Sequence, residues 1–181
     1  MKWCKKKILY GITFFVFLTV WLTCFLRVNK TYEVGAWESY RLGETYQVMG
    51  REVTWNSMCL MTREEAMEKF QMVSKQDWLS WTEGDTEYCV IGVSIKNLTD
   101  DTISPEFFHW TIQCDSYTNG ATYLTTLVNK GIVDGIQPGE SRDIWIFYNV
   151  DESLRETMLN NPVRIYVSVY PERIYLEDKL L

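Results

Sequence analysis

Few residues of the chain have the type and spacing that metal binding or nucleophilic catalysis requires. There are five cysteines and one histidine, His109, and no two cysteines have the Cys-x-x-Cys spacing of a zinc site. Nucleophilic catalysis needs a hydroxyl or thiol beside a base. His109, however, alternates with the apolar residues Phe108 and Trp110, which is typical of the solvent-facing side of a strand. We therefore predict no catalytic residue, no metal site and no cofactor.

Paired carboxylates, which act together as acid and base in glycosidases, occur at Asp100–Asp101 and at Asp151–Glu152. Both pairs fall in segments with turn composition, where acidic side chains favour local hydrogen bonds. No Asp-x-Asp-x-Asp-Gly calcium loop is present. We predict that the protein is not an enzyme.

Tryptophans are the main candidate binding residues. Trp78 and Trp81 lie three positions apart in the polar segment KQDWLSWTEGDTE, and Trp55 lies in an earlier β-prone segment. Rings of this kind stack on sugars, so Trp78, Trp81 and Trp55 form a candidate carbohydrate platform. The alternative is that they cover an edge of the core, because tryptophan is mostly buried in folded proteins.

A disulfide is the other candidate feature. If residues 89–95 and 108–114 form one antiparallel hairpin, a single register pairs Ile95 with Phe108 and Cys89 with Cys114. We predict on this basis that Cys89 and Cys114 lie close enough to form a disulfide, with Cys59 left over. Two alternatives stay open: the two strands belong to opposite sheets, or the three cysteines are buried thiols that act as small hydrophobic groups.

The location of the protein depends on residues 8–26, ILYGITFFVFLTVWLTCFL, which include no charged residue. A helix of these 19 residues would be about 28 Å long, close to the thickness of the hydrocarbon core of a bilayer. Four lysines, at positions 2, 5, 6 and 7, precede the run, so the positive-inside rule predicts a cytoplasmic N-terminus. A cleaved signal peptide and a lipid-modified cysteine are the alternatives.

The expected organisation follows from this anchor. We predict a cytoplasmic stub at residues 1–7, a single transmembrane helix that serves as signal anchor at 8–26, a linker at 27–43 and an extracytoplasmic domain at 44–181. Beyond residue 26 the chain has 14 basic and 24 acidic residues, a formal charge of −10. An acidic surface repels phosphate backbones, so we expect no nucleic-acid partner.

Alternating apolar and polar residues predict about seven short strands in this domain. The strongest signals are residues 87–97, 107–115, 123–128, 142–150 and 163–170, with a hairpin or bulge near Gly50 and a turn at residues 137–140. Thr62 and Glu65 have the spacing of a capping box, which predicts the start of a short helix. The fold class expected is therefore all-β: an immunoglobulin-like antiparallel β-sandwich with one or two short helices, with a barrel as the alternative.

The segments VIGVSIKN, FFHWTIQC, GIQPGES and DIWIFYNV together resemble the immunoglobulin-like exported domains of Gram-positive bacteria. The layout of an N-terminal anchor, a TREEA helix start at residues 62–66 and a later sandwich is similar to the family catalogued as domain of unknown function 5028. The related family 4352 shares the strand–turn–strand part. The resemblance covers most of residues 43–170, implies a membrane-bound or secreted Ig-like domain, and transfers no catalytic residue.

Two function classes follow. The first is a binding or interaction module that presents loops and an edge strand to a protein of the cell envelope. The second is a carbohydrate or envelope-polymer binder that uses Trp78, Trp81 and Trp55. In both, we expect the protein to reside in the cell membrane as a single-pass protein with its C-terminal domain outside.

Overall fold

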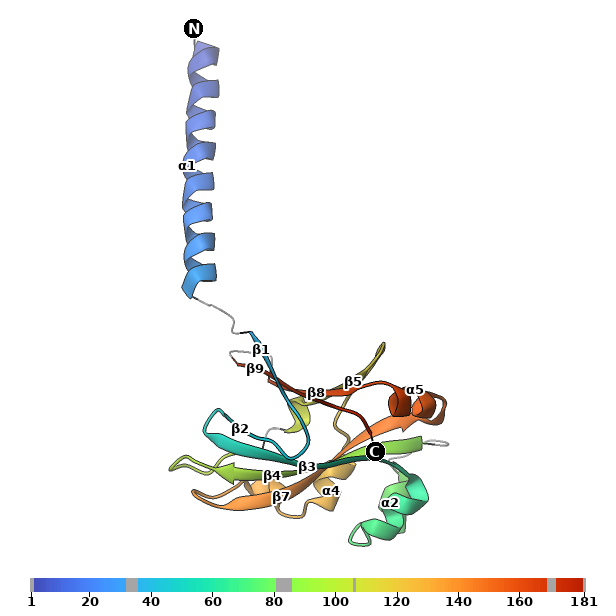
Figure 1. Cartoon of the computed structure of the whole chain (residues 1–181). Coiled ribbons are helices and arrows are strands. Elements are labelled where there is room, and N and C mark those ends of the chain that lie inside the picture. Colours follow the sequence, from blue (N-terminus) through green and yellow to red (C-terminus); the bar gives the residue numbers. More distant parts are fainter. Residues whose placement is uncertain (1, 32–35, 81–85, 106, 169–171, 181) are drawn as a thin grey trace. The chain divides into compact units, whose positions relative to one another are not determined.

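The computed structural model describes residues 2–31, 36–80, 86–105, 107–168 and 172–180; for residues 2–12, 28–31 and 108 it describes the backbone only (Figure 1). The chain divides into two compact units, Met1–Gly35 and Ala36–Leu181. We describe each unit by itself.

The N-terminal unit is a single helix, α1, Lys2–Thr31, which includes the whole apolar run. Its described side chains, residues 13–27, are exposed and mostly apolar, and Phe14, Phe17 and Trp21 are each more than half exposed. The hydroxyl groups of Thr19 and Thr23 donate to backbone carbonyls four residues earlier, both at 2.8 Å. Among the residues that the structure describes, no helix was found that is both long enough and apolar enough to cross a membrane.

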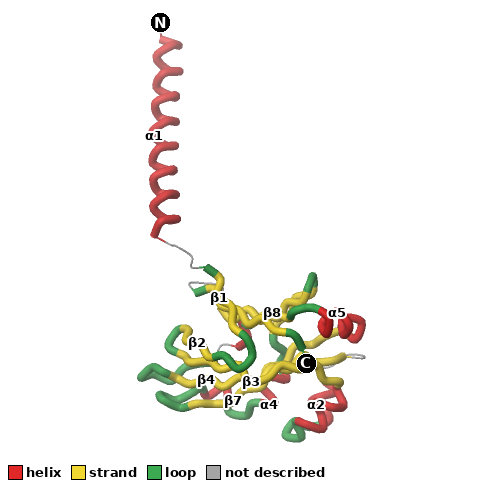
Figure 2. Tube along the Cα trace, in the orientation of Figure 1, coloured by secondary structure: helices red, strands yellow, loops and turns green. Residues whose placement is uncertain are grey.

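The C-terminal unit is a sandwich of two sheets, which confirms the mainly-β fold expected from the sequence (Figures 1 and 2). Sheet A has the strand order β1-β9-β8-β5-β6, formed by Trp37–Tyr40, Arg173–Asp178, Val163–Ser168, Thr111–Cys114 and Tyr117–Gly120. Sheet B has the order β2-β3-β4-β7, formed by Thr45–Val48, Arg51–Thr62, Thr86–Asn97 and Ser141–Asp151. All described pairs are antiparallel except β1 with β9, the first strand and the last, which are parallel.

Short helices connect the strands. After β3, the predicted capping box is present at Thr62 and Glu65 and starts α2, Arg63–Lys69. Both Thr62 bonds of the box form: its hydroxyl accepts from the Glu65 amide at 3.2 Å, and its own amide donates to the Glu65 carboxylate at 2.8 Å. The remaining helices are α3 (Lys75–Ser80), α4 (Leu124–Val128) and α5 (Arg155–Asn160), with single 3₁₀ turns η1 (Phe107–His109), η2 (Ile132–Asp134) and η3 (Glu152–Leu154).

The central part of sheet B is covered on both faces. Its inner face packs against sheet A in a main core that includes Val53, Trp55, Cys89 and Ile91. Its outer face packs under α2, α3 and α4, which lie below sheet B in Figure 1, in a second cluster that we call the helix-side core. The helix-side core contains these buried residues: Ala66, Phe70, Val73, Trp78, Tyr88, Val90, Leu124, Val128 and Phe147. On the outer face of β4, Tyr88 and Val90 are buried in the helix-side core, whereas Ser94 is half-buried and Lys96 is exposed at the other end of the strand.

Three expectations about strands were wrong. Residues 123–128 form helix α4 instead of a strand, because Leu124 and Val128 are spaced to bury one helical side against β7. The Asn119–Gly120 pair, whose composition predicts a turn, instead lies at the end of β6 with Gly120 opposite Thr111, and the chain reverses at Asp115, where φ is +51°. Residues 37–40, expected as linker, form β1 inside the sandwich unit.

The outer edge of β7 is closed by side chains. Asn129 accepts from the Trp145 amide at 2.9 Å and donates to the Trp145 carbonyl at 2.7 Å, as a neighbouring strand would. The hydroxyl of Thr125 accepts from the Phe147 amide at 3.0 Å, and Tyr117 donates to the Asn149 carbonyl. These contacts satisfy backbone groups that would otherwise offer an edge for pairing with another chain.

Candidate functional site

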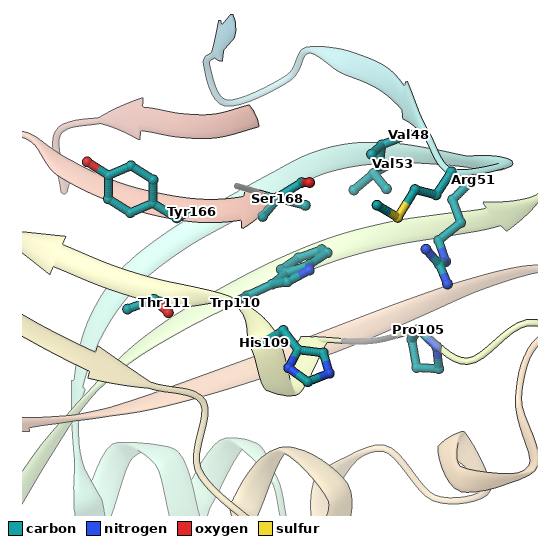
Figure 3. Close-up of a pocket in the computed structure, with 11 residues that line it drawn as sticks. Val48, Arg51, Val53, Pro105, His109, Trp110, Thr111, Tyr166 and Ser168 are labelled. Atoms are coloured by element: carbon teal, nitrogen blue, oxygen red, sulfur yellow. The ribbon is translucent and has the colours of Figure 1, made fainter. Parts of the chain in front are cut away.

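A cavity of about 330 Å³ opens between the two sheets at one end of the sandwich (Figure 3). One wall comes from the β2–β3 hairpin of sheet B, and the other comes from η1, β5 and β8 of sheet A. The lining residues are Val48, Met49, Arg51, Val53, Pro105, His109, Trp110, Thr111, Tyr166, Val167 and Ser168. This is an apolar pocket with a few polar groups at its rim, the usual composition of a ligand site.

The tight turn between β2 and β3 sets the position of the cationic side of the pocket. Met49 and Gly50 both have positive φ, +48° and +73°, as the central residues of a type I′ turn do. A Cβ on Gly50 would lie 2.4 Å from the methyl group of Thr99, so only glycine fits there. The turn places Arg51 as the first residue of β3, directly opposite Val48.

Arg51 is the buried charged group of the pocket. Its side chain is only 8% exposed, and its Nη2 donates to the carbonyl of Ser104 at 2.9 Å. In Figure 3 the guanidinium points from β3 towards Pro105 and His109. A guanidinium stays charged at all physiological pH values and presents its donors in a planar fork.

None of the described lining residues is acidic, although the chain beyond residue 26 has a formal charge of −10. The exposed His109 shares the rim with Arg51. The floor is apolar: Trp110 is 3% exposed and packs on Trp55 with ring centroids 5.7 Å apart, and Val53 is completely buried. The pocket therefore combines apolar walls with positive charge, in contrast to the acidic domain around it.

The predicted tryptophan platform is not formed by Trp55 and Trp78. Both are 0% exposed, and they lie in different clusters: Trp55 in the main core and Trp78 in the helix-side core. Neither ring has a face available to a sugar. Trp81 lies outside the described residues. The alternative, in which tryptophans cover the core, is the arrangement observed for these two residues.

The predicted hairpin that paired Cys89 with Cys114 is wrong. β4 pairs with β3 and β7 in sheet B, where Cys89 lies opposite Leu60 and Tyr148, whereas Cys114 lies in β5 of sheet A. Both cysteines are buried free thiols in the structure, and Cys59 is a half-buried free thiol. Burial raises the pKa of all three thiols, so they stay protonated near neutral pH and act as small hydrophobic groups.

The pocket residues Arg51 and Trp110 were not recognised from the sequence. Arg51 begins β3 of sheet B and Trp110 directly precedes β5 of sheet A, so only the folding of the sandwich brings them together. The one usable signal was the sequence Val-Met-Gly-Arg-Glu-Val at residues 48–53, which predicts a hairpin but does not indicate a binding site. Within the described part of the chain, no group of three or more histidine, cysteine, aspartate or glutamate residues is arranged to hold a metal ion.

The fold and the pocket define a class of protein: a two-sheet β-sandwich domain with a small apolar pocket between the sheets. Two solved structures share this fold. An uncharacterised β-sandwich protein from Clostridium difficile aligns with a TM-score of 0.54 and 15% sequence identity, over 80% of this chain and 97% of that protein. A functionally unknown protein from Listeria monocytogenes aligns with a TM-score of 0.52 and 9% identity, over 76% of this chain and 82% of that protein.

A putative lipoprotein from Bacillus subtilis gives a TM-score of 0.47 and 14% identity, over 75% of this chain and 38% of that protein. No protein-family model and no curated protein matches the sequence. The resemblance to domain of unknown function 5028 is therefore not confirmed. At such low identity, the first two structures establish the β-sandwich fold alone.

Proposed function

We propose that the protein is a membrane-anchored extracytoplasmic binding domain without catalytic activity, and that the pocket beside Arg51 is its binding site. The observation that carries this proposal is the pocket itself: apolar walls, a buried cation at the rim, and no acidic residue among the described lining residues. The proposed layout, an N-terminal anchor followed by an immunoglobulin-like sandwich, is the one implied by the resemblance to domain of unknown function 5028.

The proposed anchor is the run from Ile8 to Leu26. A helix that is apolar on every side needs an apolar surrounding, and Phe14, Phe17 and Leu26 are each more than half exposed within this chain. Threonine hydroxyls that bond back to their own helix, as Thr19 and Thr23 do, expose no unsatisfied donor to lipid. The lysines before Ile8 support a cytoplasmic N-terminus.

The pocket is small for a ligand site, because such sites usually range from about 300 to 1,000 Å³. A cavity of about 330 Å³ suits one or two side chains of a protein partner better than a large cofactor. The ligand we propose is a segment of an envelope protein that inserts an apolar group carrying a hydrogen-bond acceptor, with the acceptor directed to the Arg51 side of the rim.

The absence of catalysis is part of the proposal. The only imidazole, His109, is exposed at the pocket rim, and no described hydrogen bond joins it to a serine, threonine or cysteine. The described thiols of the sandwich are held protonated by burial. These features support a site that holds a partner and does not activate a nucleophile.

Site-specific photo-crosslinking in intact cells tests the binding site. Met49 lines the pocket and is 48% exposed, whereas Val133, in η2 on the sheet B side, is 76% exposed and serves as the matched control. A photo-reactive amino acid at position 49 should capture one defined envelope protein that the same probe at position 133 does not capture. Arg51→Gln should weaken the capture and Arg51→Lys should weaken it less. Identical capture at both positions, or none from folded protein, would refute the pocket as the site.

The anchor has a separate test. Val133→Cys in intact cells should react with a membrane-impermeant maleimide, and the full-length protein should stay in the membrane after alkaline carbonate washing. Release by the wash, or reaction of position 133 only after the membrane is permeabilised, would contradict the proposed location.

A further inference from the structure

Three aromatic rings lie side by side on the outer face of sheet A. Trp37 from β1 is T-packed against Tyr166 from β8 and Tyr175 from β9, with ring centroids 5.2 and 5.8 Å apart. Tyr166 and Tyr175 lie opposite each other in adjacent strands, with centroids 5.8 Å apart. We call these three rings the aromatic face.

Two arginines lie over two of the rings. The guanidinium carbon of Arg173 lies 5.6 Å from the centre of the Trp37 ring, and that of Arg164 lies 5.7 Å from the centre of the Tyr175 ring. Arg164 also forms an ion pair with Glu177, and the Tyr166 hydroxyl donates to Gln113 at 2.8 Å. The rings are therefore fixed in place and surrounded by groups that donate and accept hydrogen bonds.

The aromatic face does not contribute to the main core. Along β9 and β8, the residues that alternate with these tyrosines, Ile165, Ile174 and Leu176, are the buried ones. Trp37 remains 42% exposed, which is unusual for tryptophan. Exposed apolar surface rimmed by polar groups is typical of an interaction site.

We propose that the aromatic face binds a polysaccharide of the cell envelope, a polymer of pyranose sugars that carries carboxylates. The negative faces of aromatic rings attract the polarised C–H groups on the flat side of a pyranose ring. Rings on three adjacent strands form a surface along which consecutive sugars can lie. Arg173 supplies positive charge beside the Trp37 ring in a domain of formal charge −10, which matches carboxylates on the polymer, whereas the charge of Arg164 is balanced by Glu177.

A lipid surface fits the geometry less well. Tyr166 and Tyr175 are half-buried in sheet A and carry hydroxyls, whereas side chains that enter a bilayer interface protrude from the surface. This site goes beyond the function proposed for the pocket. Tyr166 also lines the pocket, but Figure 3 shows its ring directed away from Arg51 and His109. The test therefore changes Trp37 and Arg173, which do not line the pocket.

The test is co-sedimentation of full-length protein in nanodiscs with purified peptidoglycan, whose strands of acetylated amino sugars carry peptides with free carboxylates. Microcrystalline cellulose is the uncharged comparison polymer. We expect binding to peptidoglycan, weakened about tenfold by Trp37→Ala and much less by Trp37→Phe, which keeps a ring. Arg173→Gln should weaken binding to peptidoglycan and leave binding to cellulose unchanged. Tyr123→Ala is the matched control, because Tyr123 is an equally exposed aromatic residue, 47%, beside α4.

The outcomes are distinct. No sedimentation with peptidoglycan, or equal sedimentation of the original chain and Trp37→Ala, overturns the proposal. Amide hydrogen exchange of β1 that is slower in nanodiscs than in detergent, with no polymer present, assigns the face to the bilayer and also overturns it. Thermal unfolding of each variant separates loss of binding from loss of fold. Photo-crosslinking at Met49 reports on the pocket independently, so failure of one site is distinguishable from failure of the other.

Discussion

The outer faces of the two sheets are both rich in aromatic residues, yet they are used differently. On sheet B, Tyr88 and Phe147 are completely buried, because α2, α3 and α4 cover them. On sheet A, in the part of the unit that the structure describes, the outer face has no such helical layer, and Trp37 is 42% exposed. The covered face serves stability, whereas the open face is available for contact with other molecules.

The difference comes from the connections between strands rather than from the strands themselves. The segment after β3 folds into α2 and α3, and the segment after β6 folds into α4, and all three pack on sheet B. The connections between the strands of sheet A that the structure describes place no helix on the outer face of that sheet. The helical connections α2, α3 and α4 therefore determine which of the two aromatic faces is buried, although each of these segments contains only a few apolar residues.

The largest expected effect distinguishes the two faces directly. Trp78→Ala removes a fully buried ring from the helix-side core and should lower the free energy of unfolding by about 3–5 kcal/mol. Trp37→Ala, on the open face, should lower it by about 1 kcal/mol or less, because that ring stays in water. Urea unfolding of the full-length variants in detergent measures both. Equal losses of unfolding free energy in the two variants would mean that Trp37 contributes as much to stability as Trp78 does, contrary to their different burial.

A second comparison uses two glycines in strands. A Cβ on Gly92 in β4 would lie 2.6 Å from the Ser57 hydroxyl and 2.9 Å from the ring of Trp145, because that ring packs over the glycine on the covered face. Trp145 is held by Lys69, whose amine lies 4.5 Å from the ring centre. Gly92→Ala should therefore cost about 1–3 kcal/mol of stability through overpacking.

Gly120, in β6 of sheet A, is the matched control, since nothing lies within 4 Å of the position that its Cβ would occupy. Gly120→Ala should change the unfolding free energy by about 0.5 kcal/mol or less, as surface substitutions do. A Gly92→Ala variant as stable as Gly120→Ala would show that the Trp145 ring moves freely and that the covered face is loosely packed.

The third prediction concerns the edge of the covered sheet. In the structure the Phe147 amide donates to the Thr125 hydroxyl at 3.0 Å, in a buried position. Thr125→Val removes this acceptor and leaves the amide without it. The expected loss is about 1–2 kcal/mol, because an unmade buried hydrogen bond is costly. Thr125→Ser keeps the hydroxyl and should lose distinctly less. The thermal unfolding midpoints of the two variants test this prediction. A valine variant as stable as the serine variant would be evidence against a structural role for this hydrogen bond.

The sequence was informative where a pattern depends on neighbours along the chain. The capping box at Thr62 and Glu65, the hairpin around Gly50 and the strand at residues 142–150 were all predicted and are present. The capping box and the hairpin depend on contacts within a few residues, and the strand was indicated by a continuous run of β-prone residues. The sandwich followed from the number of alternating segments, because strands with one apolar face need a second sheet to cover it.

The sequence was less informative where burial depends on which segments meet. Trp78 and Trp37 both lie in polar surroundings in the sequence, and only the placement of α3 against Tyr88 and Phe147 makes one a core residue. Cys89 and Cys114 fit a hairpin in register, but β4 finds longer partners in β3 and β7. The pocket was missed for the same reason, since Arg51 begins a strand of sheet B and Trp110 directly precedes a strand of sheet A.

The smallest expected effect concerns the start of β7, at the rim of the covered sheet. The pKa of Glu140 is lowered because its carboxylate accepts from Arg142 at 2.7 Å and from the Gln137 amide at 2.8 Å. Because the folded pKa lies below the unfolded value, near 4.5, this carboxylate stabilises the fold above about pH 4.5 and loses its effect as the pH falls through the folded pKa. Glu140→Gln should therefore lower the thermal midpoint slightly at pH 7, and the difference should become smaller as the pH falls below about 4.5.

Asp151, at the other end of β7, has a pKa that is lowered by hydrogen bonds from the Ser153 hydroxyl and amide, so Asp151→Asn should show the same direction. The two ends of β7 share no partner, so the effects of the two substitutions should add in the double variant. If the difference in thermal midpoint between the original chain and either single variant became larger at lower pH, the hydrogen bonds of the charged carboxylates would not be the source of the stabilisation. That result would mean that the hydrogen bonds of Glu140 and Asp151 do not stabilise the two ends of β7.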